Sequence, residues 1–290
     1  MSRVLWRVLR EFFALLLCAW GTCVLAQGDA KRGTYLAKAG GCVACHTADS
    51  KDAVPFAGGR ALKTPFGTFF GPNITPHQQA GIGRWTEADF VNAMRHGVRP
   101  DGANYFPSFP YPSFTNIADS DLRDLWAYLR TLPASPHANK EHELRFPFGW
   151  RFLVTFWKWL FFTPGPYADI AGAPPAVNRG AYLVRALGHC GECHTPRNFL
   201  GAPRKDRTLA GGKTPEGKDV SNLTPANLKK WSDKDLSDFL TTGTTPDGDV
   251  PAEAMGEVIR NTTSQLTPID LAAMIAYLRS LAPIADEPKK

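Results

Sequence analysis

The chain has 290 residues, a length that corresponds to one large domain or two small ones. Hydrophobic residues make up 43% and charged residues 21% of it, a balance that supports packed cores and excludes a disordered chain. Six cysteines are too few to staple a chain of this size with disulfides. The net charge of +6 would suit a nucleic-acid partner.

Residues 1–26 have the features of a secretory signal peptide. Three arginines lie in the first ten residues, an apolar run covers residues 12–19, and Val-Leu-Ala at 24–26 is similar to a cleavage site. The apolar run is too short to span a bilayer, so we expect export and cleavage after Ala26. An uncleaved N-terminal anchor is the alternative. Cleavage takes away three Arg and one Glu, so the net charge falls from +6 to +4.

The rest of the chain has four cysteines, and all of them belong to two copies of the motif Cys-x-x-Cys-His. The first copy covers residues 42–46 and the second covers residues 190–194. The cysteines are Cys42, Cys45, Cys190 and Cys193, and the histidines that follow are His46 and His194. The motif therefore leaves no cysteine for a structural disulfide.

Two thiols and a histidine at this spacing are typical of covalent haem attachment. The thiols add to the two vinyl groups of one haem, and the histidine then lies against the iron as the proximal ligand. Zinc is disfavoured because it needs four ligands and each motif has three. A thioredoxin-like redox pair needs a βαβ context that the sequence lacks. Two haems would bring four propionates, which cancel the remaining charge, so we expect no nucleic-acid partner.

The two motifs lie within an internal repeat. Arg-Gly-Thr-Tyr-Leu at 32–36 is echoed by Arg-Gly-Ala-Tyr-Leu at 179–183. Asn-Ile-Thr-Pro at 73–76 is likewise echoed by Asn-Leu-Thr-Pro at 222–225. The constant order of these landmarks predicts two domains of about 100 residues each. We assign the first domain to residues 27–133, a linker to 134–176, the second domain to 177–284 and a tail to 285–290.

Both copies are predicted to be helical. Apolar stripes at helical spacing follow side chains that can cap a helix. The expected helix-starting residues are Asp29, Thr86, Ser120, Asn178, Ser232 and Thr267. No run alternates as a strand for long. The predicted fold class is therefore mainly α, with two tandem cytochrome c-type domains that each have their own core and each bind one haem covalently.

The linker carries an aromatic run, residues 146–162, with three Trp and several Phe. Lys158 interrupts this run, so it is too short to span a bilayer. Three interpretations are open. The run forms a short helix packed between the domains, or it lies on a membrane surface, since Trp and Phe flanked by Arg and Lys suit a headgroup boundary, or it docks a partner subunit.

The distal iron ligand of the second haem is predicted from the methionines. A thioether on the far side of the iron raises the potential and closes the site to substrates. Met94 and Met274 lie on predicted core stripes. Met255 instead follows a Pro-Asp-Gly motif, in what the sequence predicts to be a loop before the last helix. We therefore expect Met255 to ligate the second haem.

The first copy has Phe109 at the position that aligns with Met255. Phenylalanine has no lone pair to donate, so the first haem is either five-coordinate or ligated by another residue. His96 is the nearest candidate, and Met94 and His77 are others. A surface role for His96 is the alternative.

These motifs resemble the cytochrome c subunits of bacterial membrane-associated alcohol, aldehyde and gluconate dehydrogenases. The matching stretches are residues 73–76, 81–85, 95–102, 110–112, 178–183, 188–198 and 255–258. The resemblance implies electron transfer from a periplasmic dehydrogenase, with His46 and His194 as proximal ligands and Met255 as a distal ligand. Those subunits usually carry three haem domains, a C-terminal anchor and Met in place of Phe109. We expect two haem domains and no such anchor in this chain, and its sequence has Phe at position 109.

The leading hypothesis is a dihaem electron-transfer protein in the periplasm, free or membrane-associated. A dehydrogenase would be the donor, and quinone, another cytochrome or a terminal oxidase the acceptor, through small transient interfaces. The rival is a peroxidase-like or other haem enzyme that uses an open first haem as its active site. The first copy has no distal acid or base at an identifiable spacing, which favours an electron-transfer subunit over a catalyst. A structural or sensor module has no support beyond the open haem.

Overall fold

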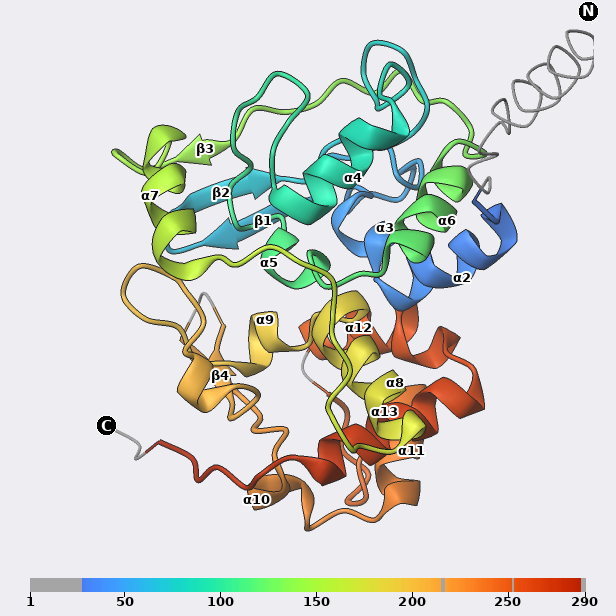
Figure 1. Cartoon of the computed structure of the whole chain (residues 1–290), viewed down its shortest axis with the longest axis vertical. Coiled ribbons are helices and arrows are strands. Elements are labelled where there is room, and N and C mark those ends of the chain that lie inside the picture. The colour runs from blue at the N-terminus through green and yellow to red at the C-terminus, as the bar shows by residue number, and fades with distance from the viewer. Residues whose placement is uncertain (1–27, 215–216, 252, 288–290) are drawn as a thin grey trace, which may run out of the picture.

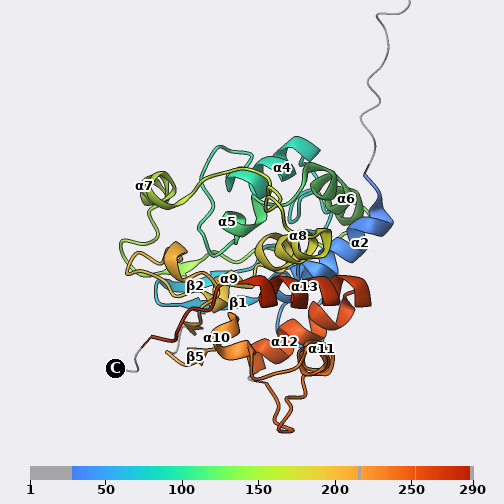
Figure 2. The same cartoon turned by 60° about the horizontal axis from the view of Figure 1, so that its bottom comes forward.

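The computed structural model describes residues 28–214, 217–251 and 253–287, and the predicted signal peptide lies outside the described residues. The fold is mainly α, as expected from the sequence. The described chain forms a first half, residues 28–144, and a second half, residues 175–287. The two halves lie one over the other (Figures 1 and 2).

The first half is built around a pair of crossing helices, α2 and α6. Gly33 lies at the crossing, where a Cβ atom would come within 1.9 Å of the Asp124 carbonyl oxygen, so only glycine allows this approach. The helices of this half are α2 (Ala30–Ala39), α3 (Cys42–Cys45), α4 (Glu87–His96), α5 (Tyr111–Phe114) and α6 (Asp119–Leu129).

The second half repeats this crossing with α8 and α13. Gly180 occupies the equivalent place, where a Cβ atom would come within 1.9 Å of the Ala273 carbonyl oxygen. The helical elements of this half are α8 (Pro175–Tyr182), η1 (Leu183–Leu187), α9 (Gly191–His194), η2 (Lys205–Arg207), α10 (Pro225–Leu228), α11 (Asp233–Thr242), α12 (Glu253–Asn261), η3 (Thr263–Gln265) and α13 (Pro268–Ser280).

One helix differs between the halves because the second half has one more residue. Gly33 precedes Cys42 by nine residues, and Gly180 precedes Cys190 by ten. The extra residue is taken up in η1, a π-helical turn in which Gly188 N donates to Leu183 O over five residues, at 2.7 Å. The cysteine motif can therefore lie in the same position relative to the glycine crossing in both halves.

Short antiparallel strands accompany the helices. In the first half β1 (Ala61–Thr64) pairs with β2 (Gly67–Phe70), and β2 pairs with β3 (Glu143–Leu144). In the second half β4 (Gly212–Lys213) pairs with β5 (Asp219–Val220). The sequence did not predict these strands, because segments of two to four residues are too short to show an alternating pattern.

Four of the six expected helix starts are confirmed. Thr86 and Ser232 form complete capping boxes, and Asp29 and Thr267 accept from backbone N–H groups of the first turn. The predictions that Ser120 and Asn178 start helices were wrong. Ala118 starts α6, and Tyr182 accepts a hydrogen bond from its N–H.

For Asn178, the reason is that α8 begins earlier, at Pro175, whose fixed φ suits a first helical turn. The Asn178 amide oxygen instead accepts from the N–H of Ile170 at 2.7 Å, in the segment that precedes the helix.

The larger of two hydrophobic clusters in the described residues runs through both halves. It includes Leu36 and Leu125 of the first half with Leu183 and Leu271 of the second, each at most 6% exposed. The expectation of a separate core for each copy is therefore wrong. The reason is that α2 and α5 contact η1 across the interface, so the two helix pairs bury apolar surface against each other.

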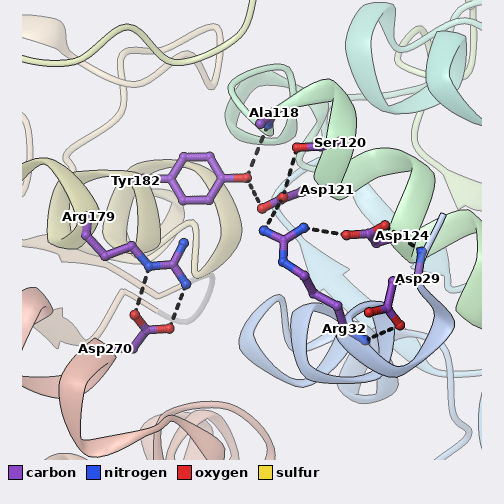
Figure 3. Close-up of polar contacts among 9 residues, drawn as sticks. All are labelled: Asp29, Arg32, Ala118, Ser120, Asp121, Asp124, Arg179, Tyr182 and Asp270. Atoms are coloured by element: carbon purple, nitrogen blue, oxygen red, sulfur yellow. Dashed lines mark hydrogen bonds and ion pairs between the residues drawn. The ribbon is translucent and has the colours of Figure 1, made fainter. Parts of the chain in front are cut away.

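A reciprocal set of polar contacts joins the halves beside this core. Tyr182 donates to Asp121 Oδ2 at 2.7 Å, and Asp121 also pairs with Arg32 at 2.5 Å (Figure 3). On the other side of the interface Tyr35 donates to Asp270 Oδ2 at 2.5 Å, and Arg179 pairs with Asp270 at 2.6 Å.

In each set the arginine and aspartate come from one half and the tyrosine from the other. Backbone N–H groups complete the match, because Ala118 N donates to Tyr182 Oη at 3.2 Å and Thr267 N donates to Tyr35 Oη at 3.3 Å. The interface therefore has approximate twofold symmetry. We call these two sets the tyrosine latches.

The linker is ordered and contains α7 (Phe152–Phe161), at the outer edge of the molecule in both views (Figures 1 and 2). Val154 is the one buried residue of α7, while Phe156 is 62% and Trp159 is 83% exposed. The aromatic run therefore does not pack wholly between the halves. Among the helices of the described ranges, none has both the length and the hydrophobicity of a membrane span.

Candidate functional site

The two Cys-x-x-Cys-His motifs fold alike in the two halves. A left-handed residue precedes each first cysteine, Gly41 with φ 61° and His189 with φ 39°. This conformation suits glycine but is unusual for histidine. His189 is held in it by a hydrogen bond from Nδ1 to Leu187 O at 2.9 Å and by edge contact with the Phe114 ring at 5.1 Å. Each motif then turns through a short helix, α3 or α9.

The His46 ring is held by a backbone carbonyl group. Its Nδ1 lies 2.7 Å from the Pro72 carbonyl oxygen. A carbonyl oxygen can only accept, so Nδ1 carries the proton and Nε2 keeps its lone pair. Burial lowers the pKa of His46 and outweighs the opposing effect of this hydrogen bond, so the ring is neutral near pH 7.

His194 repeats this arrangement in the second half. Its Nδ1 lies 2.7 Å from the Ser221 carbonyl oxygen, and burial lowers its pKa as well. A second partner that fixes the tautomer and the ring plane is typical of histidines that bind metal. Both neutral histidines therefore have an unprotonated Nε2 whose lone pair can bind a metal.

The repeated Asn-x-Thr-Pro loops explain how these carbonyls are held. Asn73, 2% exposed, follows Pro72 and donates through Nδ2 to the carbonyls of Ser135 and His137, both at 2.9 Å. Its Oδ1 accepts from the Thr75 N–H at 2.9 Å. A buried side chain with all these partners holds the preceding carbonyl in place.

Asn222 does the same after Ser221. It donates to Ile284 O at 2.8 Å and to Asp286 Oδ1 at 2.9 Å, and it accepts from the Thr224 N–H at 2.8 Å. The chain that follows the last helix of each half therefore returns to support the proximal histidine of that half.

The four cysteines of the motifs are available for thioether attachment. All four are free of disulfides. Burial raises the pKa of Cys42 and of Cys190 to about 12, so both are neutral thiols near pH 7. Within the part of the chain that the structure describes, no three His, Cys, Asp or Glu side chains gather as a bare ion would need. The donor set therefore fits a haem in each half.

Met255 lies on a helix and not in the predicted loop. It belongs to α12 and packs, partly buried, against the hydrophobic cluster. The loop prediction was wrong because the Pro-Asp-Gly turn ends before residue 253, and the apolar face of the next residues packs on that cluster. Met94 and Met274 are 7% and 4% exposed in the cluster, which confirms them as packing residues.

Phe109 lies among aromatic rings. Its ring centroid is 5.3 Å from that of Tyr105, 5.8 Å from that of Phe114 and 6.3 Å from that of Tyr111. Tyr111 is fully buried, and its hydroxyl group has no hydrogen-bond partner within the described chain.

The three candidate substitutes for a distal methionine are placed elsewhere or already engaged. His96 is exposed at the end of α4, and Met94 is buried in the hydrophobic cluster. The Nδ1 of His77 accepts from the N–H of Ala80 at 3.1 Å within its own loop. The surface interpretation of His96 therefore agrees with its position.

The two motifs lie close together, and each meets the other half. The α12 helix contacts α3, and Arg60 pairs with Glu257 of α12 at 2.8 Å. In return, Ser113 of α5 donates to Glu192 of α9 at 2.7 Å. The pKa of Cys45 is raised first by burial and further by the charge of Glu257.

Two sets of residues around the motifs were not identified from the sequence as functional. Asn73 and Asn222 belong to repeated loops that were used only as landmarks, so a signal was present. Tyr35 and Tyr182 are also repeated, but nothing in a linear sequence indicates that each reaches into the other copy.

Comparison with known proteins gives one family match and several related sequences. Residues 30–133 match the cytochrome c family model. A protein of Cereibacter sphaeroides described as "Diheme cytochrome c-type" is 46% identical over 262 residues, which cover 89% of this chain and 87% of that protein. The fructose dehydrogenase cytochrome subunit of Gluconobacter japonicus is 39% identical over 86% of this chain and 52% of that subunit.

The gluconate 2-dehydrogenase cytochrome c subunit of Pantoea cypripedii is 36% identical over 94% of this chain and 65% of its own length. The chain thus spans between half and two thirds of these two dehydrogenase subunits. These relatives confirm the resemblance drawn from the sequence motifs.

Proposed function

The chain belongs to the cytochrome c family, and from that premise we propose that it is a periplasmic dihaem cytochrome that relays electrons. Electron transfer is the activity that the family supports. The donor would be a dehydrogenase, since several relatives are named as cytochrome subunits of such enzymes. The acceptor would be quinone, another cytochrome or a terminal oxidase.

The observation that carries the proposal is the duplicated proximal histidine geometry. Cys42 and Cys45 would hold one haem and Cys190 and Cys193 the other, with His46 and His194 as proximal ligands through Nε2. Bound haem supplies an iron that alternates between ferric and ferrous states. The residues of this chain orient the donors: Pro72 and Ser221 accept the Nδ1 protons, and Asn73 and Asn222 keep those carbonyls fixed.

A distal ligand for the second haem is assigned to Met255. Its thioether is a soft donor, and Met255 lies partly buried beside the core. A thioether ligand favours ferrous iron and raises the potential of that haem. The contacts between α12 and α3, and between α5 and α9, support a short path between the two haems.

A haem enzyme is the second candidate, and one observation favours it. Phe109 cannot ligate iron, and the nearby hydroxyl group of Tyr111 is buried without a partner, so it could donate to a molecule bound at an open iron. A relay remains the proposed function, because the named relatives are cytochrome subunits of dehydrogenases.

The proposal is tested by counting haems. Pyridine haemochrome analysis of the protein produced with a haem attachment system should give two covalent haems per chain. Cys190→Ala with Cys193→Ala, and the matched pair Cys42→Ala with Cys45→Ala, should each leave one. A single haem in the wild type, or zinc in stoichiometric amount, would refute a dihaem protein.

A further inference from the structure

An exposed apolar surface lies along the linker. We call it the aromatic ridge, and it consists of Phe146, Trp150, Phe152, Phe156, Trp159 and Leu160. Their exposed fractions run from 50% for Trp150 to 83% for Trp159. Such a run of exposed aromatic side chains is unusual on a protein surface and marks a contact with something apolar.

The cations of α7 point the opposite way. Arg151 donates to the Asn104 carbonyl at 2.8 Å, and its guanidinium lies 4.4 Å from the centre of the Phe106 ring. Lys158 donates to the His96 carbonyl at 2.6 Å and to Asn104 Oδ1 at 2.8 Å. Residues 151, 154 and 158 share one face of the helix, and that face is bound to the first half. The helix is therefore amphipathic with its charged face inward.

The outer face is also poor in hydrogen-bonding groups. Residues 146–162 contain no Asp or Glu, and Thr155 already accepts from Asn104 Nδ2 at 2.9 Å. Protein–protein interfaces carry about one hydrogen bond per 100–200 Å² and need such groups to set their register. The helix α7, which carries Phe152, Phe156, Trp159 and Leu160 of the ridge, lies at the outer edge of the molecule in both views (Figures 1 and 2).

We propose that the aromatic ridge inserts into the headgroup region of a lipid bilayer. Trp and Phe side chains favour this region because their rings are apolar while the indole N–H can still reach water or headgroups. Since Arg151 and Lys158 are engaged within the protein, the attachment is driven by apolar contact and not by attraction to anionic lipid. This inference does not depend on electron transfer.

The test is flotation of the haem-loaded full-length protein with vesicles. The protein should float with pure phosphatidylcholine vesicles as well as with an equal mixture of phosphatidylcholine and phosphatidylglycerol. Raising the salt concentration should not release it, because salt screens charges and not apolar contacts. Phe156→Gln with Trp159→Gln should weaken binding at least about tenfold, since two exposed aromatic side chains lose their burial in the bilayer.

Ile269→Gln is the matched control, because Ile269 is 80% exposed on α13 and lies outside the ridge. It should bind as the wild type does, and both variants should keep the haem absorbance and circular dichroism of the wild type. Binding only to the anionic vesicles, with release by salt, would overturn the proposal. Absence of flotation with both kinds of vesicle would also overturn it. If the double variant then lost binding to a dehydrogenase subunit, the ridge would be a docking site for a protein.

Discussion

The two halves of the molecule are nearly identical on the proximal side of the motifs and differ on the distal side. Each has a glycine crossing, a histidine whose Nδ1 donates to a carbonyl, and a buried asparagine behind that carbonyl. In the second half Met255 lies on the nine-residue helix α12, whereas in the first half Phe109 precedes the four-residue helix α5. The repeat thus preserves how a haem would be held and changes what would face its iron.

Substituting the two aligned distal residues should give the largest contrast. Met255→Ala should remove a thioether–iron charge-transfer band and lower the midpoint potential of one haem, because the thioether stabilises ferrous iron. Phe109→Ala is the matched control and should leave that band unchanged. Absorbance spectra and a redox titration measure both effects. An unchanged spectrum of Met255→Ala would remove this residue as a ligand.

Carbon monoxide should distinguish the two irons next. We expect the reduced wild type to bind one equivalent readily, because an iron opposite Phe109 has no ligand bond to break. Phe109→Met should bind no carbon monoxide under the same conditions, since a thioether would then occupy the open position of the iron.

His96→Ala is the control for this titration, and it should behave as the wild type because His96 is exposed. A wild type that binds no carbon monoxide, together with a His96→Ala variant that binds one equivalent, would show that His96 is a ligand after all.

The tyrosine latches should have a moderate and equal effect in the two halves. Tyr35→Phe and Tyr182→Phe each remove one hydroxyl group that donates to a carboxylate across the interface. Each should lower the free energy of unfolding by about 1–2 kcal/mol, measured by denaturant titration.

Tyr167→Phe is the control, because the Tyr167 hydroxyl group is buried without a partner in the described chain and its loss should cost nothing. A much larger loss for only one of the two latch variants would contradict the symmetry of the interface.

The smallest expected effect is on acid stability. Burial alone would raise the pKa of Asp270, but the hydrogen bonds from Arg179 and Tyr35 outweigh it, and the net pKa lies below the ordinary value. A lowered carboxyl pKa adds stability above the unfolded pKa of about 3.9, and this stability is lost as the pH falls through the folded pKa.

The unfolding free energy of the wild type should therefore fall more steeply below about pH 4 than that of Asp270→Asn. Equal slopes for the two proteins would show that Asp270 does not contribute in this way.

The sequence was sufficient for features that depend on local chemistry. Thr86 and Ser232 cap their helices because each has an acidic residue three positions later. Met94 and Met274 were identified as packing residues from helical spacing alone. Haem attachment remains a prediction from the Cys-x-x-Cys-His spacing, but it needs only five consecutive residues.

Only the tertiary structure decided features that join distant segments. The shared core, the tyrosine latches and the support of His46 by Pro72 and Asn73 connect residues that are tens to hundreds of positions apart. The inward direction of the Arg151 and Lys158 side chains was also decided by the tertiary structure. Composition predicts a basic aromatic helix but does not show which face of it packs against the first half. Local patterns report the preference of a segment, whereas burial and hydrogen bonding across the interface depend on which surfaces meet, and that choice is made by the whole chain.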